Sequence, residues 1–326
     1  MVESKYWVWP AKETSALQTE TLEAPGPDDV LIETRFSGVS PGTEMALYTM
    51  AHVGFKDPDN HYAEYPHRGG YLNVGVVAEA GANAQEKCPP GTWVFSGATH
   101  SQYAISTPGD SGWAGCWALP EALQAPEAVY LGLAKVGYTA PYLAPAALGE
   151  TVAVLGGGLV GNLAAQLYNV SGAKVVSVER DDFRREVALG CGLEAVSSIE
   201  EVEGHFGGAP ELVVEATGVP ELVVEAFKMA AQGGRVVILS SPRGEAPVNF
   251  YSQIHAKLIT VIGAHTKAVT DSSAATRLMI DLVASGKLAL KQLVTHVEPW
   301  QKAPEVWDTY ARGPEERLGT VFDWQD

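Results

Sequence analysis

Cysteine and long apolar stretches are both scarce in this sequence. The 326 residues contain three cysteines, and the wide spacing of Cys88, Cys116 and Cys191 supports neither a disulfide framework nor a C-x-x-C metal knuckle. No run of about 18 uninterrupted apolar residues occurs, and the stretch MVESKYWVWP lacks the basic and apolar regions of a signal peptide. We therefore expect free thiols, a cytoplasmic location and no association with a membrane.

Positive charge is also in short supply. The chain has 22 Lys and Arg residues against 39 Asp and Glu residues, which gives a net charge of −17. This excess of negative charge opposes binding to nucleic acid and to anionic membrane surfaces. We therefore expect neither nucleic acid nor a membrane as a partner, and the motifs described below predict a small-molecule substrate. At 326 residues the chain is long enough for two domains with separate cores.

The order of the segments divides the chain into two regions. Up to about residue 125, short β-type runs alternate with turn residues, which indicates a compact, mostly β domain. From residue 126, predicted strands and helices alternate, which indicates an α/β region with a parallel sheet and helices on both faces. The predicted strands of this second region are residues 151–155, 174–178, 212–215, 235–239 and 258–263.

A glycine turn follows the first of these strands and is the most informative motif. Gly156, Gly158 and Gly161 satisfy G-x-G-x-x-G between a predicted strand and a predicted helix. The first glycine permits a tight turn, the second lets the backbone approach a pyrophosphate, and the third lets the helix pack on the strand. The helix that begins at Leu159 and Val160 would direct unpaired N–H groups at the diphosphate. The motif predicts a dinucleotide site, the alternatives being a structural turn or another nucleotide.

The end of the next predicted strand indicates which dinucleotide binds. Glu179 falls 18 residues after Gly161, where a carboxylate can accept hydrogen bonds from both ribose hydroxyls. This favours NAD over NADP, because the carboxylate would repel a 2′-phosphate. Arg180 is the opposing feature, since an arginine at this place can hold a 2′-phosphate. The alternative for Arg180 is a solvated charge within residues 179–185.

Taken in order, several segments resemble the medium-chain dehydrogenase/reductase superfamily. They include FSGVSPGTE at 36–44, GGYLNVGVVAEAG at 69–81, VVEATG at 213–218, GGRVVILSSPRG at 233–244 and KLITVIGAH at 257–265. The resemblance implies a GroES-like, mostly β catalytic domain at residues 1–125 and 266–326, interrupted by a doubly wound Rossmann domain at residues 126–265. It also implies an active site between the two domains, with the nicotinamide ring near Ala216, Thr217, Ser240 and Ser241.

Zinc-dependent members of that superfamily carry ligands that this chain lacks. Ser40 stands where those members have a cysteine, Tyr71 and Leu72 where they have a His-Glu pair, and Gly132 where they have another cysteine. A hydroxyl and a neutral phenol are poor zinc ligands compared with thiolate and imidazole. The structural zinc lobe is also missing, because the chain runs from Val94 through Phe95 into SGATHSQYAIS without such an insertion. We therefore expect no metal.

Without zinc, protein side chains must polarise a carbonyl and manage its proton. We hypothesise that Tyr71 is the acid/base and that Lys135 lowers the pKa of its phenol. A proton relay through Thr43 or Ser40 is the competing hypothesis. Tyr71 could instead be a packed aromatic and Lys135 a solvent-facing residue. Glu44 is placed either to contact substrate or to cap the following helix.

Histidines offer further candidates. His265 follows the segment KLITVIG, and the resemblance places it at the substrate pocket, whereas for His255 we expect a structural or exposed role. Three more, at residues 52, 61 and 67, lie in a loop whose aromatic residues could form a substrate lid. The alternative is a surface loop that is packed by its own side chains.

Together these features predict an NAD(H)-dependent, zinc-independent oxidoreductase that interconverts a secondary alcohol and its ketone. The substrate class expected from the resemblance is a polyol, a sugar or a hydroxyalkyl compound. The alternatives are a quinone or enone reductase of the same superfamily and a non-enzymatic nucleotide-binding protein. The apolar segment KLITVIGA is expected at a sheet edge, which predicts a homodimer.

Overall fold

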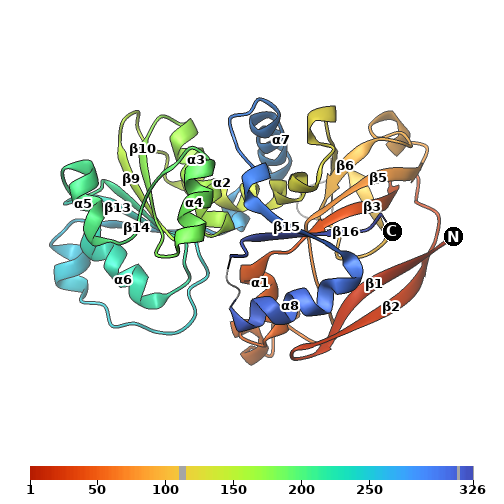
Figure 1. Ribbon diagram of the computed structural model, residues 1–326, viewed down its shortest axis with the longest axis horizontal. Helices are drawn as coiled ribbons and strands as arrows, with labels where there is room; N and C mark the ends of the chain where they lie inside the picture. Colours follow the sequence, from red (N-terminus) through yellow and green to blue (C-terminus); the bar gives the residue numbers. More distant parts are fainter. Residues whose placement is uncertain (110–114, 314–315, 326) are drawn as a thin grey trace. The chain divides into compact units, whose positions relative to one another are not determined.

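A computed structural model describes residues 1–109, 115–313 and 316–325 (Figure 1). These residues form two compact units. The β-rich unit contains residues 1–132, 271–284 and 294–326, and the parallel-sheet unit contains residues 133–270 and 285–293. The domain limits that we expected, after residues 125 and 265, remain predictions. Among the described residues, no helix is both long and apolar enough to cross a membrane.

The β-rich unit is built on a seven-stranded sheet with the order β15-β16-β3-β5-β6-β8-β7. Strand β3 also pairs with β7, so the five strands from β3 to β7 in this order close into a ring. Closure leaves these strands without a free edge. The strands are β3 (Val30–Gly38), β5 (Asn73–Ala80), β6 (Trp93–Ser96), β7 (Tyr103–Pro108), β8 (Gly115–Ala118), β15 (Val294–Pro299) and β16 (Gly319–Asp323).

A smaller three-stranded sheet and three α-helices complete this unit. The sheet has the order β2-β1-β4, formed by β1 (Val2–Ala11), β2 (Thr14–Leu22) and β4 (His67–Arg68). The helices are α1 (Pro41–Tyr48), α7 (Ser272–Ala284) and α8 (Ala303–Arg312).

Helix α8 shows how the sequence builds the core of the β-rich unit. Its buried residues Ala303, Val306, Trp307 and Tyr310 recur at the spacing of one helix face. The Trp307 ring lies 5.8 Å from that of Trp7 and packs edge-on against it. Such aromatic packing buries a large apolar area and anchors α8 on the small sheet.

The parallel-sheet unit is a doubly wound α/β domain. Its six strands are all parallel, in the order β11-β10-β9-β12-β13-β14. They are β9 (Thr151–Leu155), β10 (Lys174–Val178), β11 (Glu194–Val196), β12 (Leu212–Glu215), β13 (Arg235–Ile238) and β14 (Thr260–Gly263). The strand order reverses between β9 and β12, and in open α/β sheets ligands bind outside the carboxyl ends of the strands at such a point.

Helices cover both faces of this parallel sheet (Figure 1). One face packs against α2 (Leu131–Leu143), α3 (Leu159–Val170) and α4 (Asp182–Gly190), and the other against α5 (Glu200–Phe206) and α6 (Pro220–Met229). The strands are buried on both sides, which explains their continuous Val and Leu content. The predicted α/β fold class is confirmed.

A short segment from late in the sequence also belongs to this unit. The Gln166 side chain accepts a hydrogen bond from the Ala289 backbone N–H at 2.7 Å and donates one to the Ala289 carbonyl at 3.1 Å. This pair of bonds holds residues 285–293 on α3. The sequence analysis did not anticipate this contact, because it assigned the segment to the other domain.

Candidate functional site

The glycine turn has the geometry that a dinucleotide site requires. Gly156 adopts φ +102°, which side chains rarely tolerate. A Cβ on Gly161 would lie 2.0 Å from the Gly156 carbonyl oxygen, so glycine is needed where α3 packs on β9. By contrast, nothing lies within 4 Å of a Cβ placed on Gly158. The space over Gly158 is therefore open to a ligand, and the N-terminus of α3, at Leu159 and Val160, begins beside it.

Glu179 is held against this turn. Its carboxylate accepts hydrogen bonds from the backbone N–H of Gly157 at 2.8 Å and of Asp181 at 3.0 Å, and the residue is 8 % exposed. Arg184 places a guanidinium nitrogen 3.9 Å from the same carboxylate, whereas Arg180 is exposed. The structure thus brings the glycine turn and the acidic residue together at the carboxyl ends of β9 and β10.

A second group of polar residues lies at the carboxyl ends of β12 and β13. Ala216 and Thr217 follow β12, and Ser240 and Ser241 follow β13 closely. Glu215, which is fully buried, connects them and was not among the residues predicted from the sequence. Its carboxylate accepts hydrogen bonds from the hydroxyls of Thr217 and Ser240. An acidic residue ending the apolar strand LVVE was the available signal.

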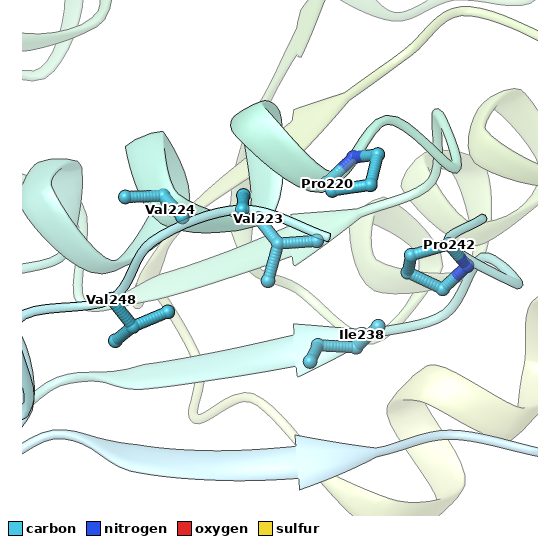
Figure 2. A pocket seen from close by; sticks show the side chains of 7 residues that line it. Pro220, Val223, Val224, Ile238, Pro242 and Val248 are labelled. Atoms are coloured by element: carbon cyan, nitrogen blue, oxygen red, sulfur yellow. The ribbon is translucent and has the colours of Figure 1, made fainter. Parts of the chain in front are cut away.

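An apolar hollow of about 210 Å³ lies beside this second group (Figure 2). It lies between α6 and the segment after β13, and its lining residues are Pro220, Val223, Val224, Ile238, Pro242, Ala246 and Val248. No polar side chain lines it, so this hollow offers apolar contact and no reacting group.

In the β-rich unit, three hydroxyls come together. Ser40 precedes α1 and Tyr71 precedes β5. The Ser40 hydroxyl lies 2.5 Å from the Tyr71 phenol oxygen, and this phenol lies 3.4 Å from the Thr43 hydroxyl. The sequence analysis selected all three residues as candidates for proton transfer, and the fold joins them into one hydroxyl cluster. Whether this cluster transfers a proton remains a prediction.

The environment of Tyr71 differs from the one we expected. Burial raises the pKa of the phenol to about 12, although the hydrogen bonds with Ser40 and Thr43 act to lower it. This direction is opposite to the lowering that we expected from Lys135. Lys135 itself lies on α2 in the parallel-sheet unit and is 3 % exposed, and burial lowers its pKa to about 8. It is therefore not the solvent-facing residue of the alternative reading, and its partnership with Tyr71 stays a prediction.

Glu44 lies beneath the hydroxyl cluster. It is 1 % exposed, and its carboxylate accepts the Ser40 backbone N–H at 2.7 Å, which caps the start of α1. The other carboxylate oxygen lies 3.2 Å from Nε2 of His100 and accepts the indole N–H of Trp307 at 3.1 Å. This geometry favours the capping alternative over contact with substrate.

His100 is a second buried polar residue that the sequence analysis missed. Its Nδ1 lies 2.7 Å from the Ser37 hydroxyl, which accepts the indole N–H of Trp324 at 2.8 Å. A Cβ on Gly70 would come within 2.7 Å of the His100 ring, so a glycine beside Tyr71 makes room for the imidazole. The contacts join three segments that are distant in sequence, and local pattern carries no signal for them.

The remaining candidate histidines lie at the surface or in a packed loop. His265 is exposed, and its Nδ1 accepts the Lys267 backbone N–H at 3.1 Å; contact with substrate remains a prediction. His255 is exposed and packs near Tyr251. The Tyr62 ring, in the loop before β4, lies 5.7 Å from the His52 ring of the same loop and 5.8 Å from the ring of His67, the first residue of β4. These contacts favour a loop packed by its own side chains over an open lid.

The side chains at Ser40, Tyr71, Leu72 and Gly132, the positions that the resemblance assigns to zinc ligands, do not fit a catalytic zinc. Two oxygens bound to one tetrahedral zinc at about 2.0 Å would lie roughly 3.3 Å apart, whereas those of Ser40 and Tyr71 are in direct hydrogen-bond contact at 2.5 Å. Leu72 is fully buried and apolar, and Gly132 has no side chain. These four positions therefore supply neither the ligand types nor the spacing of a zinc site.

The chain is similar to known dehydrogenases. The family model described as "Zinc-binding dehydrogenase" matches residues 160–285. Human sorbitol dehydrogenase is 26 % identical over 343 residues, covering 90 % of this chain and 93 % of that protein. L-threonine 3-dehydrogenase of Bacillus licheniformis is 28 % identical over 173 residues, and this match spans 51 % of the chain and about half, 49 %, of that relative. The family match lies wholly C-terminal to Ser40, Tyr71, Leu72 and Gly132, so it does not bear on the zinc ligands.

The fold is also found among solved structures. The structure of 2R,3R-butanediol dehydrogenase from Bacillus subtilis superposes with a TM-score of 0.83 at 19 % sequence identity, covering 99 % of this chain and 100 % of that one. At this sequence identity the likeness shows the fold alone.

Proposed function

Because the chain belongs to the medium-chain dehydrogenase/reductase superfamily, we propose that it is an NAD(H)-dependent, zinc-independent oxidoreductase that interconverts a secondary alcohol and its ketone. The observation that carries the proposal is the hydrogen bond of 2.8 Å from the Gly157 N–H to the Glu179 carboxylate. This bond supports the proposal because Glu179, which we expect to bind the ribose, lies beside the glycine turn that we expect to bind the phosphates, at the reversal of strand order.

The residues around the turn support binding of the cofactor as follows. The open space over Gly158 admits a pyrophosphate, and the N-terminal N–H groups of α3 donate to it. Glu179 retains acceptor capacity beyond its two backbone bonds, since a carboxylate has about four acceptor positions. The adenosine ribose hydroxyls would donate to it. When bound, the nicotinamide supplies the chemistry of accepting or donating a hydride at C4.

The hydroxyl cluster supports a metal-free route for the alcohol proton. With its pKa raised to about 12, the Tyr71 phenol stays protonated near neutral pH. A protonated phenol that exchanges hydrogen bonds with the Ser40 and Thr43 hydroxyls can donate to a carbonyl oxygen and pass protons along the cluster. In this proposal Tyr71 contacts the reacting oxygen, and Ser40 and Thr43 relay its proton.

The names of the relatives support an alcohol as the substrate. Sorbitol dehydrogenase and L-threonine 3-dehydrogenase both take their names from hydroxyl compounds. We therefore include polyols, sugars and hydroxyalkyl compounds in the proposed substrate class. A quinone or enone reductase would likewise need no zinc, but Glu179 opposes the NADPH that such enzymes generally use.

Screening secondary alcohols, polyols and enones for a change in NADH absorbance tests the proposed function. Oxidation of an alcohol with NAD would support it. Turnover of enones alone would establish the reductase instead, and cofactor binding without turnover of any substrate would favour a nucleotide-binding protein.

A matched pair of glycine variants tests the cofactor site. Gly158→Ala places a methyl group in the open space and should weaken NADH binding at least tenfold without unfolding the protein, because Gly158 has φ −65°. Gly204→Ala on α5 also meets nothing within 4 Å and should leave NADH affinity unchanged. Equal NADH affinity of both variants would contradict the site.

A further inference from the structure

Glu215 is a buried carboxylate that is satisfied entirely by neutral donors. It ends β12 and has no exposed surface. One oxygen accepts the backbone N–H groups of Thr217 at 2.6 Å and Gly218 at 3.0 Å, together with the Thr217 hydroxyl. The other oxygen accepts the Ser240 hydroxyl. Four donors from two loops therefore converge on one side chain.

These bonds determine which way two hydroxyl protons point. A carboxylate can only accept, so Thr217 and Ser240 must each donate their proton inward to Glu215. The Thr217 oxygen also accepts the Val219 backbone N–H at 3.1 Å. The lone pairs of Ser240, a partly buried residue, remain available to a ligand. The Thr217 and Ser240 hydroxyls can therefore offer a ligand hydrogen-bond acceptors but no donor.

The position of this pair in the sheet indicates what it would meet. Thr217 and Ser240 follow β12 and β13, on the opposite side of the strand-order reversal from β10 and Glu179. A doubly wound dinucleotide domain holds one nucleotide on each side of this reversal. With the adenosine half at Glu179, the second nucleotide lies over β12 and β13. A nicotinamide mononucleotide offers ribose O–H and carboxamide N–H donors, which complement outward-facing acceptors.

We propose that Glu215 is a positioning residue that orients the Thr217 and Ser240 hydroxyls as acceptors for the nicotinamide mononucleotide half of the cofactor. The proposal deepens the proposed function and rests on its cofactor. It assigns Glu215 a role in selecting the second nucleotide, which differs from the role of Glu179 in binding the first. Glu215 acts through the two hydroxyls and does not touch the cofactor.

A purely structural role for Glu215 makes a different prediction. The turn after β12 touches the glycine turn, since the Ala216 N–H donates to the Leu155 carbonyl at 2.9 Å and a Cβ on Gly156 would meet the Thr217 side chain at 2.9 Å. If Glu215 only supported this turn, its loss would disturb the diphosphate site as well. ADP, which lacks the second nucleotide, would then bind as poorly as NADH.

Calorimetric titration of Glu215→Gln with ADP and with NADH separates the two roles. The glutamine oxygen can keep the backbone N–H bonds of Thr217 and Gly218, whereas its amide nitrogen would donate to Ser240 and turn that hydroxyl proton outward. We expect ADP affinity to stay within about twofold of the wild type and NADH affinity to fall at least about tenfold. Glu225→Gln on α6 is the matched control, because Glu225 is partly buried and accepts a hydrogen bond from the exposed Lys228, and it should change neither affinity.

Ser240→Ala provides a second, milder variant should Glu215→Gln fail to fold. Loss of one neutral hydrogen bond predicts about a three- to tenfold loss of NADH affinity with unchanged ADP affinity. Equal weakening of ADP and NADH in both variants would overturn the positioning role, as would unchanged NADH affinity in both. Failure of the wild type to bind either ADP or NADH would instead refute the proposed function itself.

Discussion

The Ser40 hydroxyl oxygen and the Tyr71 phenol oxygen lie 2.5 Å apart although 31 residues separate them in the chain. Both residues stand at positions where the sequence resemblance places zinc ligands in metal-dependent relatives. At this distance the two oxygens do not have the spacing of two ligands on one zinc ion, which is roughly 3.3 Å. Glu44 is tied to this hydroxyl cluster of Ser40, Thr43 and Tyr71, because its carboxylate accepts the Ser40 backbone N–H.

Metal independence follows from this contact as a prediction. Purified protein should contain no stoichiometric zinc, and treatment with a chelator should leave turnover unchanged, because Ser40, Tyr71, Leu72 and Gly132 provide no thiolate or imidazole. Elemental analysis measures the zinc content directly. One zinc per chain, lost together with activity on chelation, would contradict the prediction.

Removal of the Tyr71 hydroxyl should separate chemistry from cofactor binding. Tyr71→Phe should keep NAD affinity while turnover falls about 10²- to 10⁴-fold, the usual span for loss of a general acid or base. Steady-state kinetics and NAD titration measure the two effects. Tyr103→Phe, on β7 of the same unit, is the matched control and should retain turnover.

The same measurements distinguish the competing proton routes. If Tyr71→Phe keeps near-normal turnover while Thr43→Val or Ser40→Ala abolishes it, the two smaller hydroxyls carry the proton and Tyr71 is a packing residue. Full activity of all three variants would rule out the hydroxyl cluster as the route of the proton.

Cofactor preference should depend on Glu179. In the proposed site its carboxylate would accept hydrogen bonds from the ribose hydroxyls and would repel a 2′-phosphate, so NAD(H) should bind at least about tenfold tighter than NADP(H), as expected for charge-assisted hydrogen bonds. Glu179→Gln should narrow this difference, whereas Glu186→Gln, an exposed carboxylate on α4, should not. Calorimetric titration measures this preference. Equal or tighter binding of NADP(H) by the wild type would contradict the prediction and would favour Arg180 as the residue that binds the 2′-phosphate.

Lys135 should make stability depend on alkaline pH. Burial lowers its pKa from 10.5 to about 8, so between these values the unfolded chain holds a proton that the folded chain has lost. Stability therefore rises with pH across this window, by on the order of 3 kcal/mol. Lys135→Met should abolish this rise. Urea denaturation of both proteins at the two ends of the window measures it, and an identical pH dependence would disprove the assignment.

Strand β14 should mediate self-association. It is the edge strand of the parallel sheet, and Val261 on it is 39 % exposed. Because an exposed apolar edge pairs readily, we expect at least a homodimer at micromolar concentration by light scattering. Val261→Lys should lower the mass to that of a monomer, whereas Val170→Lys, which is similarly exposed at 41 % on α3, should not. A wild-type monomer would contradict the prediction.

Strands with continuous apolar runs could be predicted from the sequence, whereas strands with a weak or very short apolar pattern could not. Strands β9, β10 and β12 lie where the apolar runs predicted them, because buried parallel strands carry continuous Val and Leu. The hairpin of β1 and β2 gave no comparable signal, since most of β2 is exposed or only partly buried and lacks a clear apolar alternation. Strand β11, with three residues, is too short for a periodic pattern.

The glycine turn and Glu179 could be recognised in the linear chain because backbone conformation and strand-to-helix spacing are local properties. Gly156, Gly158 and Gly161 have their roles within a single βαβ unit. The partners of Glu44 and Glu215 could not be recognised in this way. His100 lies 56 residues from Glu44, and Ser240 lies 25 residues from Glu215. Such pairs form only when segments that are distant in sequence pack together, because each buried polar group needs a hydrogen-bond partner and only the packed chain brings one within reach.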